Sequence, residues 1–239
     1  MATVLTPSPD ISTLTTVVAA ITAIGGLGTA ASGLVDSTKA FWGGVSNVGF
    51  DKIEKALAPF RPALVLAESD WTATLRANWI NGVPKDDQKA AAKSLIRLGL
   101  SSTNAAQMAT AGHVDADGLA AVLTAVETGA TLTPVQVNLL GRFNGAIDAA
   151  MDGGFEQADQ EYRNASKLCA GLAAIGLAVW GGALLTGVKS WALFLAYLAK
   201  PEFGEALLVG IIAVPLAPVA KNLTSSLQAA VTAMKAVKT

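Results

Sequence analysis

Three segments without charge are the clearest pattern along this chain. Asp, Glu, Lys and Arg are absent from residues 11–35, 168–188 and 206–220. A helix crosses the hydrocarbon core of a bilayer with roughly 20 mainly apolar residues. The first two segments reach that length and the third is shorter. The pattern predicts an integral membrane protein with about three transmembrane helices.

The three predicted spans differ in quality. Segment 168–188 is the best candidate, with 21 uncharged residues between Lys167 and Lys189, whereas segment 11–35 is diluted by Ser, Thr and Gly. The third segment contains Pro215 and Pro218, which predict a bent helix packed against the others. Segment 190–199 is too short to span, so it is expected to extend the second span or to lie at the membrane interface.

Residues 36–167 carry most of the charge and have a helical pattern throughout. No sustained alternation of β-branched residues predicts a strand, so the expected fold class is all-α, with a helical extramembrane domain inserted between the first and second spans. Segment 37–60 is amphipathic and is expected either to lie on the membrane surface or to pack on that domain. Further helices are predicted over 64–80, 85–98, 101–111, 115–128 and 133–151.

Glycine-rich sequence after the last of these helices predicts a break at Asp152-Gly153-Gly154, with a new helix running from Phe155 into the second span. The predicted organisation has six parts. They are an extended lead-in (1–10), the first span (11–35), an amphipathic interfacial segment (36–62), a helical soluble domain (63–153), a helix leading into the second and third spans (154–220), and a C-terminal amphipathic helix and tail (221–239).

Small residues recur at spacings of three and four in all three spans. Such a line lets helix backbones approach closely in a membrane, where no hydrophobic force drives helices together. The lines are expected to pack within the chain or between copies in an oligomer, and the Ser/Thr-bearing line of the first span could also face water in a pore. The predicted helix-packing residues are Thr15, Ala19, Thr22, Gly26, Thr29, Gly33, Gly171, Ala174, Ala178, Gly181, Gly210, Ala213 and Ala217.

The composition of the chain limits the kinds of partner that it is expected to bind. Hydrophobic residues make up 52% of the chain, charged residues 15%, and the net charge is −1. That balance argues against a nucleic-acid partner, which needs a concentrated basic surface. The single cysteine, Cys169, excludes a disulfide within the chain and lies in an apolar segment, where a small buried side chain is expected.

Candidate chemistry is sparse. The only histidine, His113, opens a stretch that imitates the first half of a calcium-binding loop, but Thr124 stands where the bidentate Glu is required. Asp115 is therefore predicted to cap a helix. No catalytic, nucleotide-binding or metal-binding motif is present, so no cofactor and no metal is expected.

Positive charges near the predicted spans favour one orientation. They place the N-terminus outside and the middle domain inside, although Lys189 and Lys200 fall in the short outer connection. The alanine-rich composition and the absence of disulfides within the chain are compatible with a bacterial inner membrane. The charges on the inner side are Lys39, Lys52, Lys55, Arg163, Lys167, Lys221, Lys235 and Lys238.

The sequence predicts a non-catalytic membrane protein, surrounded by the lipid bilayer, that acts as an oligomeric scaffold or as an accessory subunit of a larger membrane complex. The alternative is a pore-forming or channel protein, including a membrane-inserting helical toxin or lysis protein. An enzyme that uses His113 or a carboxylate of the middle domain is the third hypothesis.

Overall fold

The computed structural model describes residues 11–41 and 43–237, and the side chains of 16–41, 43–223 and 225–226 within them. The lead-in predicted for residues 1–10 lies outside the described residues. The described residues form helices and connecting turns and contain no strand, which confirms the all-α fold class. The chain divides into two compact units, Lys39–Asn164 and Met1–Thr38 together with Ala165–Thr239.

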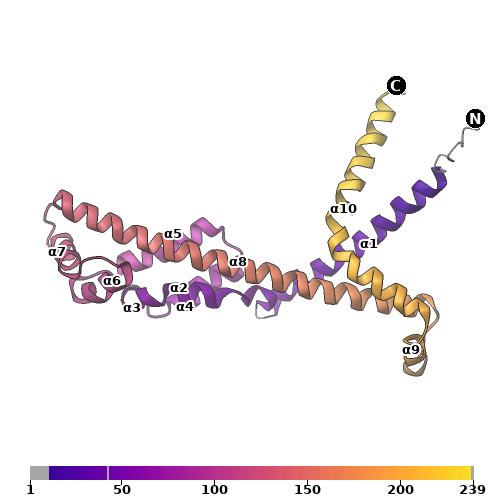
Figure 1. The fold of residues 1–239 in the computed structure, drawn as a ribbon, viewed down its shortest axis with the longest axis horizontal. Helices are drawn as coiled ribbons and strands as arrows, with labels where there is room; N and C mark the ends of the chain where they lie inside the picture. The colour runs from indigo at the N-terminus through magenta and orange to yellow at the C-terminus, as the bar shows by residue number, and fades with distance from the viewer. Residues whose placement is uncertain (1–10, 42, 238–239) are drawn as a thin grey trace, which may run out of the picture. The chain divides into compact units, whose positions relative to one another are not determined.

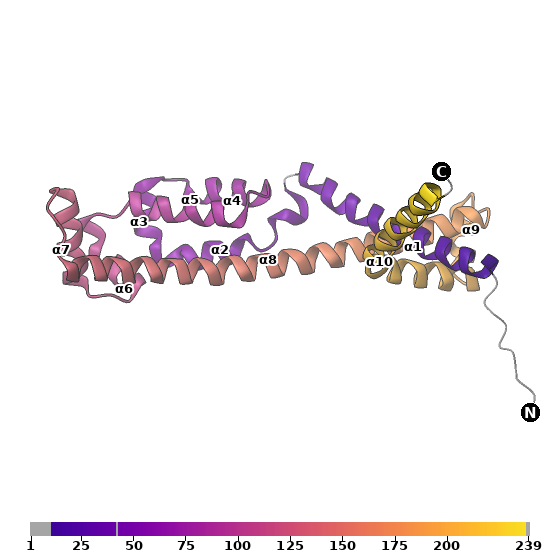
Figure 2. The ribbon, with the colours of Figure 1, turned by 90° about the horizontal axis from the view of Figure 1, so that it is seen from above.

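The charged unit, Lys39–Asn164, is built from short helices and the first part of one long helix, α8. Figures 1 and 2 show α8 running alongside α2. The helices are α2 (Phe50–Leu57), α3 (Arg61–Ala67), α4 (Trp71–Ile80), α5 (Lys85–Leu98), α6 (Ala105–Gly112), α7 (Ala116–Glu127) and α8 (Pro134–Leu185), with 3-10 turns η1 (Thr38–Ala40), η2 (Gly44–Asn47), η3 (Ala58–Phe60) and η4 (Ser102–Asn104).

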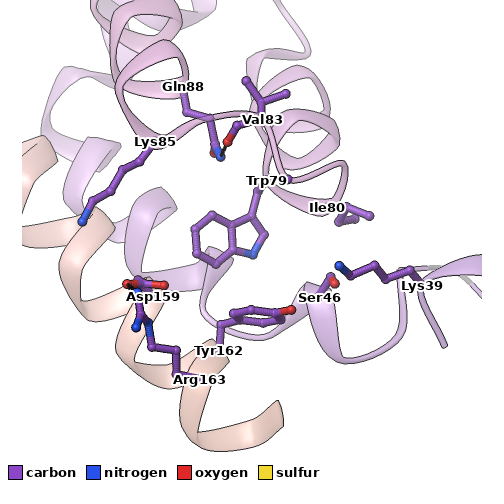
Figure 3. Close-up of a pocket in the computed structure, with 11 residues that line it drawn as sticks. Lys39, Ser46, Trp79, Ile80, Val83, Lys85, Gln88, Asp159, Tyr162 and Arg163 are labelled. Atoms are coloured by element: carbon purple, nitrogen blue, oxygen red, sulfur yellow. Dashed lines mark hydrogen bonds and ion pairs between the residues drawn. The ribbon is translucent and has the colours of Figure 1, made fainter. Parts of the chain in front are cut away.

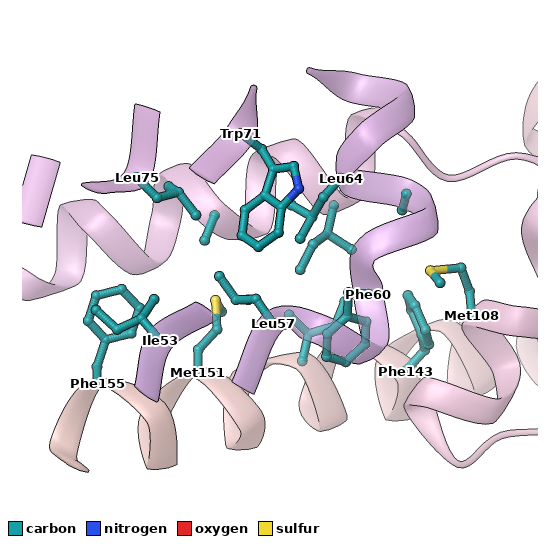
Figure 4. Packing of buried hydrophobic residues seen from close by; sticks show 14 of the residues in the cluster. Ile53, Leu57, Phe60, Leu64, Trp71, Leu75, Met108, Phe143, Met151 and Phe155 are labelled. Atoms are coloured by element: carbon teal, nitrogen blue, oxygen red, sulfur yellow. The ribbon is translucent and has the colours of Figure 1, made fainter. Parts of the chain in front are cut away.

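A continuous apolar core joins these helices (Figure 4). Phe60 and Phe143 are buried and meet edge to face, with ring centroids 6.3 Å apart. The apolar face of α2 is fully occupied by this core, where Phe50, Ile53 and Leu57 are all buried. Packing on the charged unit, one of the two roles expected for segment 37–60, therefore accounts for this face.

A line of polar pairs joins α5 to α8 along one side of the core. The basic residues of α5 recur every four residues, and their partners on α8 recur every four residues in the opposite direction, as two antiparallel helices require. The pairs are Lys85–Glu156, Lys89–Asp152 (2.5 Å), Lys93–Asp148 (2.6 Å) and Arg97–Asn144 (3.1 Å).

Several predicted elements are confirmed in this unit. Helix α5 covers the predicted range 85–98, and Gly99 follows it as the C-cap. Asp115 caps α7 as expected, because its side chain accepts a hydrogen bond from the Gly118 amide at 2.6 Å.

Two predicted boundaries are wrong. Segment 64–80 is divided between α3 and α4, because Glu68 is extended and its carboxylate accepts a hydrogen bond from the Thr74 hydroxyl at 2.6 Å. The break expected at residues 152–154 is absent, since α8 passes through it. Gly154 has a packing role there: a Cβ at this position would lie 2.5 Å from the Ala56 Cβ of α2.

The apolar unit contains α1 (Ile11–Ser37), the last part of α8, α9 (Trp191–Tyr197) and α10 (Pro201–Val237). Helix α8 ends at Leu185 in a turn where Gly187 has φ 79°, and Ser190 caps the separate α9. Segment 190–199 therefore does not extend the second helix. Figure 1 shows the bend in α10, which contains Pro215 and Pro218.

Three helices are long and apolar enough to cross a membrane. Among the described residues they cover Thr16–Ala40, Pro134–Leu185 and Pro201–Leu223, and each overlaps one of the three uncharged segments. Only residues 186–188 of the uncharged segments fall outside a helix, which supports the expected number of candidate spans.

The Lys89–Asp152 pair makes the stability of the chain depend on pH. A hydrogen bond from Lys89, and then its positive charge, holds the pKa of Asp152 below the ordinary value of 3.8. The stabilisation is complete above that ordinary value and is lost as the pH falls through the lower folded pKa. Asp152→Asn should lower the thermal midpoint of the full chain in detergent at pH 6, and the difference from wild type should disappear as the pH falls below the folded pKa of Asp152.

A double-mutant cycle provides the control. In a Lys89→Met background, Asp152→Asn should have a much smaller effect on the midpoint, because the hydrogen bond and the charge of Lys89 are already lost and only the weaker attraction of Lys85 remains. An equal effect of Asp152→Asn in both backgrounds would contradict the pairing.

Candidate functional site

The contact between α1 and α10 is made by glycines. A Cβ on Gly25 would overlap the side chain of Ala220, and one on Gly28 would overlap the backbone carbonyl of Ala213. Figures 1 and 2 show the two helices side by side where they cross. Backbones this close are typical of helices that pack through small residues.

Helix α8 completes the packing of the apolar unit. Ala31 of α1, Ala174 of α8 and Ala213 of α10 are fully buried against one another. A Cβ on Gly210 would lie 2.5 Å from the Cα of Ile175. Three backbones therefore meet where only small side chains fit.

The structure brings part of the predicted helix-packing set together. Ala174 and Ala178 of α8 and Gly210 and Ala213 of α10 are buried, and Ala217 lies beside Gly25. Gly171 and Gly181 are half-buried, and a Cβ on either would meet no atom within 4 Å.

The predicted line on α1 lies away from this contact. Ala19, Gly26, Thr29 and Gly33 are exposed and Thr22 is half-buried. A Cβ on Gly26 or Gly33 would meet no atom within 4 Å. The side chain of Thr15 lies outside the described residues.

Helix α1 therefore carries two lines of small residues. Gly25, Gly28 and Ala31 form the inner line, which packs against α10 and which the sequence interpretation missed. The outer line consists of Ala19, Thr22, Gly26, Thr29 and Gly33. The adjacent residues Gly25 and Gly26 place one glycine on each line. Spacings of three and four residues fit both lines, so spacing alone does not show which line packs within the chain.

Hydroxyl groups on α1 bond within their own helix. Thr29 donates to the carbonyl of Gly25 and Ser32 donates to the carbonyl of Gly28, each at 3.0 Å. Such bonds satisfy a hydroxyl in an apolar environment without water.

Candidate catalytic groups are dispersed. His113 is exposed and ends α6 in a left-handed conformation with φ 51°. Cys169 is a half-buried free thiol in α8. Among the described residues, no group of three or more His, Cys, Asp and Glu side chains is placed to hold a metal ion.

A pocket of about 280 Å³ lies in the charged unit (Figure 3). Its apolar wall is the pair Trp79 and Tyr162, whose ring centroids are 6.2 Å apart at an interplanar angle of 80°. Its polar groups include Lys39, Ser46 and the ion pair between Arg163 and Asp159 at 2.9 Å. The sequence interpretation missed this pocket because Trp79 and Tyr162 are remote from each other along the chain.

No protein-family model, curated protein or solved structure matches this chain.

The glycine contact predicts opposite effects for two matched substitutions. Gly28→Ala should destabilise the chain by about 1–3 kcal/mol, because the new methyl group meets the Ala213 carbonyl. In a detergent that keeps the chain monomeric, Gly26→Ala should be neutral or stabilise the chain by about 0.5–1 kcal/mol, because its Cβ enters open space within one chain and alanine favours the helix. Unfolding of the two variants in the same detergent measures both; equal effects would contradict the close approach of α1 and α10.

Proposed function

We propose that this chain is a non-catalytic integral membrane protein that forms a homo-oligomer and serves as a scaffold or accessory subunit of a membrane complex. The exposed outer line of α1 is the observation that carries this proposal. It presents two open glycines on a helix whose opposite face is already packed within the chain.

Membrane insertion is supported by the surface of the apolar unit. Large apolar side chains on α8 and α10 point away from its packed centre. Leu172 and Trp180 are each 61% exposed, and Ile211 is 50% exposed. Contact between such a surface and lipid tails carries no free-energy penalty, whereas exposure of the same surface to water does. The positive charges near the spans support the orientation described above, with the N-terminus outside a bacterial inner membrane.

Oligomer formation gives the outer line a physical role. Glycine in a helix is about 1 kcal/mol less favourable than alanine, so open glycines at Gly26 and Gly33 weaken α1 within one chain. A second helix that packs on this line gains the close backbone contact that glycine allows. The same geometry operates on the inner line against α10.

The buried polar side chains support a non-catalytic role. Within the described residues these are Ser46, Gln88 and Asn104. Gln88 donates to the carbonyl of Val83 at 2.6 Å and Asn104 donates to the carbonyl of Gly99 at 2.7 Å. Both amides therefore bind the backbone and hold turns together.

A pore lined by α1 has less support. A water-filled channel uses hydroxyls that point to the lumen, and Thr29 on the outer line already donates to its own helix. The test is conductance across a planar bilayer. A current that the wild type carries and that Thr22→Trp blocks would establish the pore in place of the scaffold.

The mass of the detergent-solubilised chain tests the proposal. The wild type should be a defined oligomer, and Gly26→Leu or Gly33→Leu should weaken its association at least tenfold, about 1.4 kcal/mol. Gly176→Leu is the matched control, because Gly176 is exposed on α8, a Cβ there meets no atom within 4 Å, and it lies outside the outer line. A monomeric wild type, or equal weakening by Gly176→Leu, would contradict the proposal.

A further inference from the structure

We propose that a pocket at the end of α8 binds one anionic phospholipid, with the headgroup phosphate at Lys189 and part of one acyl chain against Trp180. This pocket (the α8–α9 pocket) has a volume of about 420 Å³ and lies entirely within the apolar unit. Helix α8, the turn that follows it and α9 all contribute to its lining. The lipid ligand rests on the membrane insertion proposed above.

Aromatic rings form the wall of this pocket on the side of α9. The ring of Phe194 is stacked on Trp191, with ring centroids 5.5 Å apart, and its centroid lies 6.4 Å from that of Trp180 on α8. Tyr197 holds α9 in place, because it is buried beside Phe194 and its hydroxyl donates to the carbonyl of Glu202 on α10 at 3.3 Å. Contacts within the chain therefore form the wall without a ligand.

The apolar part of the lining is open to the surroundings of the chain. Trp180 is 61% exposed and Trp191 is 72% exposed, and Leu184, on the same face of α8 as Trp180, is exposed as well. An acyl chain removes this apolar area from water and contacts the flat faces of the rings. The volume falls in the range of about 300–1,000 Å³ that is typical of sites for small organic ligands, so part of one acyl chain fits.

The polar groups of the lining are neighbours in the turn after α8. They are the ammonium of Lys189 and the hydroxyl of Ser190. Lys189 forms no ion pair with any carboxylate among the described residues. The Ser190 hydroxyl accepts a hydrogen bond from the Leu193 amide at 3.4 Å, so its own hydrogen is available for a further acceptor. An ammonium and a hydroxyl together suit the oxygens of a phosphate.

The order of these groups along the chain matches the order of the groups in a phospholipid. Lys189 is the first charged residue after the uncharged segment 168–188, so it lies at headgroup level when that segment spans the membrane. Trp180 comes five residues before the end of α8, about 8 Å deeper at about 1.5 Å per residue. The proposed orientation gives no reason for a lysine in the outer connection, and an anionic headgroup provides one.

Binding of lipid to the full chain in detergent tests the pocket, with phosphatidylglycerol and phosphatidylcholine of identical acyl chains as the probes. The wild type should prefer phosphatidylglycerol about fivefold, which corresponds to about 1 kcal/mol for one lysine beside an anionic headgroup. Lys189→Gln should abolish that preference, as measured by native mass spectrometry. Trp180→Ala should weaken the binding of both lipids about fivefold, because it removes apolar surface and keeps the charge.

Two matched variants are the controls. Lys200→Gln makes the same charge change in the same connection but outside the pocket, and it should keep the preference for phosphatidylglycerol. Leu185→Ala removes an exposed apolar side chain of α8 that does not line the pocket, and it should leave the binding of both lipids unchanged. An equal loss of preference in Lys200→Gln and Lys189→Gln would contradict the proposed site.

Other occupants of the pocket give different results. Displacement of phosphatidylglycerol by oleate at equal concentration would make a free fatty acid the ligand in place of a phospholipid. Dissociation of the oligomer by Trp180→Ala, with lipid binding unchanged, would mean that a second copy of the chain covers the aromatic wall. Unchanged phosphatidylglycerol binding in both Lys189→Gln and Trp180→Ala would also overturn the proposal.

Alkaline carbonate extraction of membranes that contain the chain tests insertion independently of the pocket. A chain that stays in the membrane but lacks the lipid preference refutes the pocket alone. A chain that is extracted refutes insertion and, with it, the lipid ligand.

Discussion

The close approach of α1 and α10 at Gly25 and Gly28 is the constraint on which the apolar unit depends. Neither position has room for a Cβ, so the two backbones touch over this part of the helices. The contact fixes which face of α1 is used within the chain. The opposite face, which carries Gly26 and Gly33, is left open. In the proposed oligomer, a second copy of the chain packs on that opposite face.

The charged unit is held together by a different kind of contact. Large side chains fill its core, and the edge-to-face pair of Phe60 and Phe143 is an example. The α5–α8 polar pairs lie outside this core and are partly exposed to water, so each contributes little by itself. Their shared spacing of four residues aligns the two helices in one register. Core packing supplies stability, and the pairs add specificity of alignment.

Much of this fold could be predicted from the sequence, because the strongest signals are local. The absence of charge marks the apolar helices, and Asp115 marks the start of α7 through a hydrogen bond to an amide three residues away. Gly153 and Gly154 misled the prediction. The helix cost of Gly154 is offset by close packing on Ala56, which lies far away in the sequence, whereas a Cβ on Gly153 would meet no atom within 4 Å. The division at Glu68 was also missed: Glu68 is extended between the two helices, and its carboxylate accepts a hydrogen bond from the Thr74 hydroxyl.

The candidate sites were less predictable than the fold because they depend on which residues meet. Spacing identified small residues on α1 but did not distinguish the line with Gly25 from the line with Gly26. The pocket combines Trp79 and Tyr162, two aromatic residues from separate helices, and nothing in either local sequence links them. Contacts between distant segments are not encoded in a local pattern of polar and apolar residues.

Disulfide cross-linking between copies in the membrane tests the central claim most directly. In a Cys169→Ala background, Thr29→Cys should form a covalent dimer under mild oxidation, because the outer line of one copy faces that of another and cysteine is close to threonine in size. Val35→Cys, at a position only 8% exposed on the inner side of α1, should remain monomeric. Absence of the dimer for Thr29→Cys, or equal dimer formation by both variants, would contradict the account.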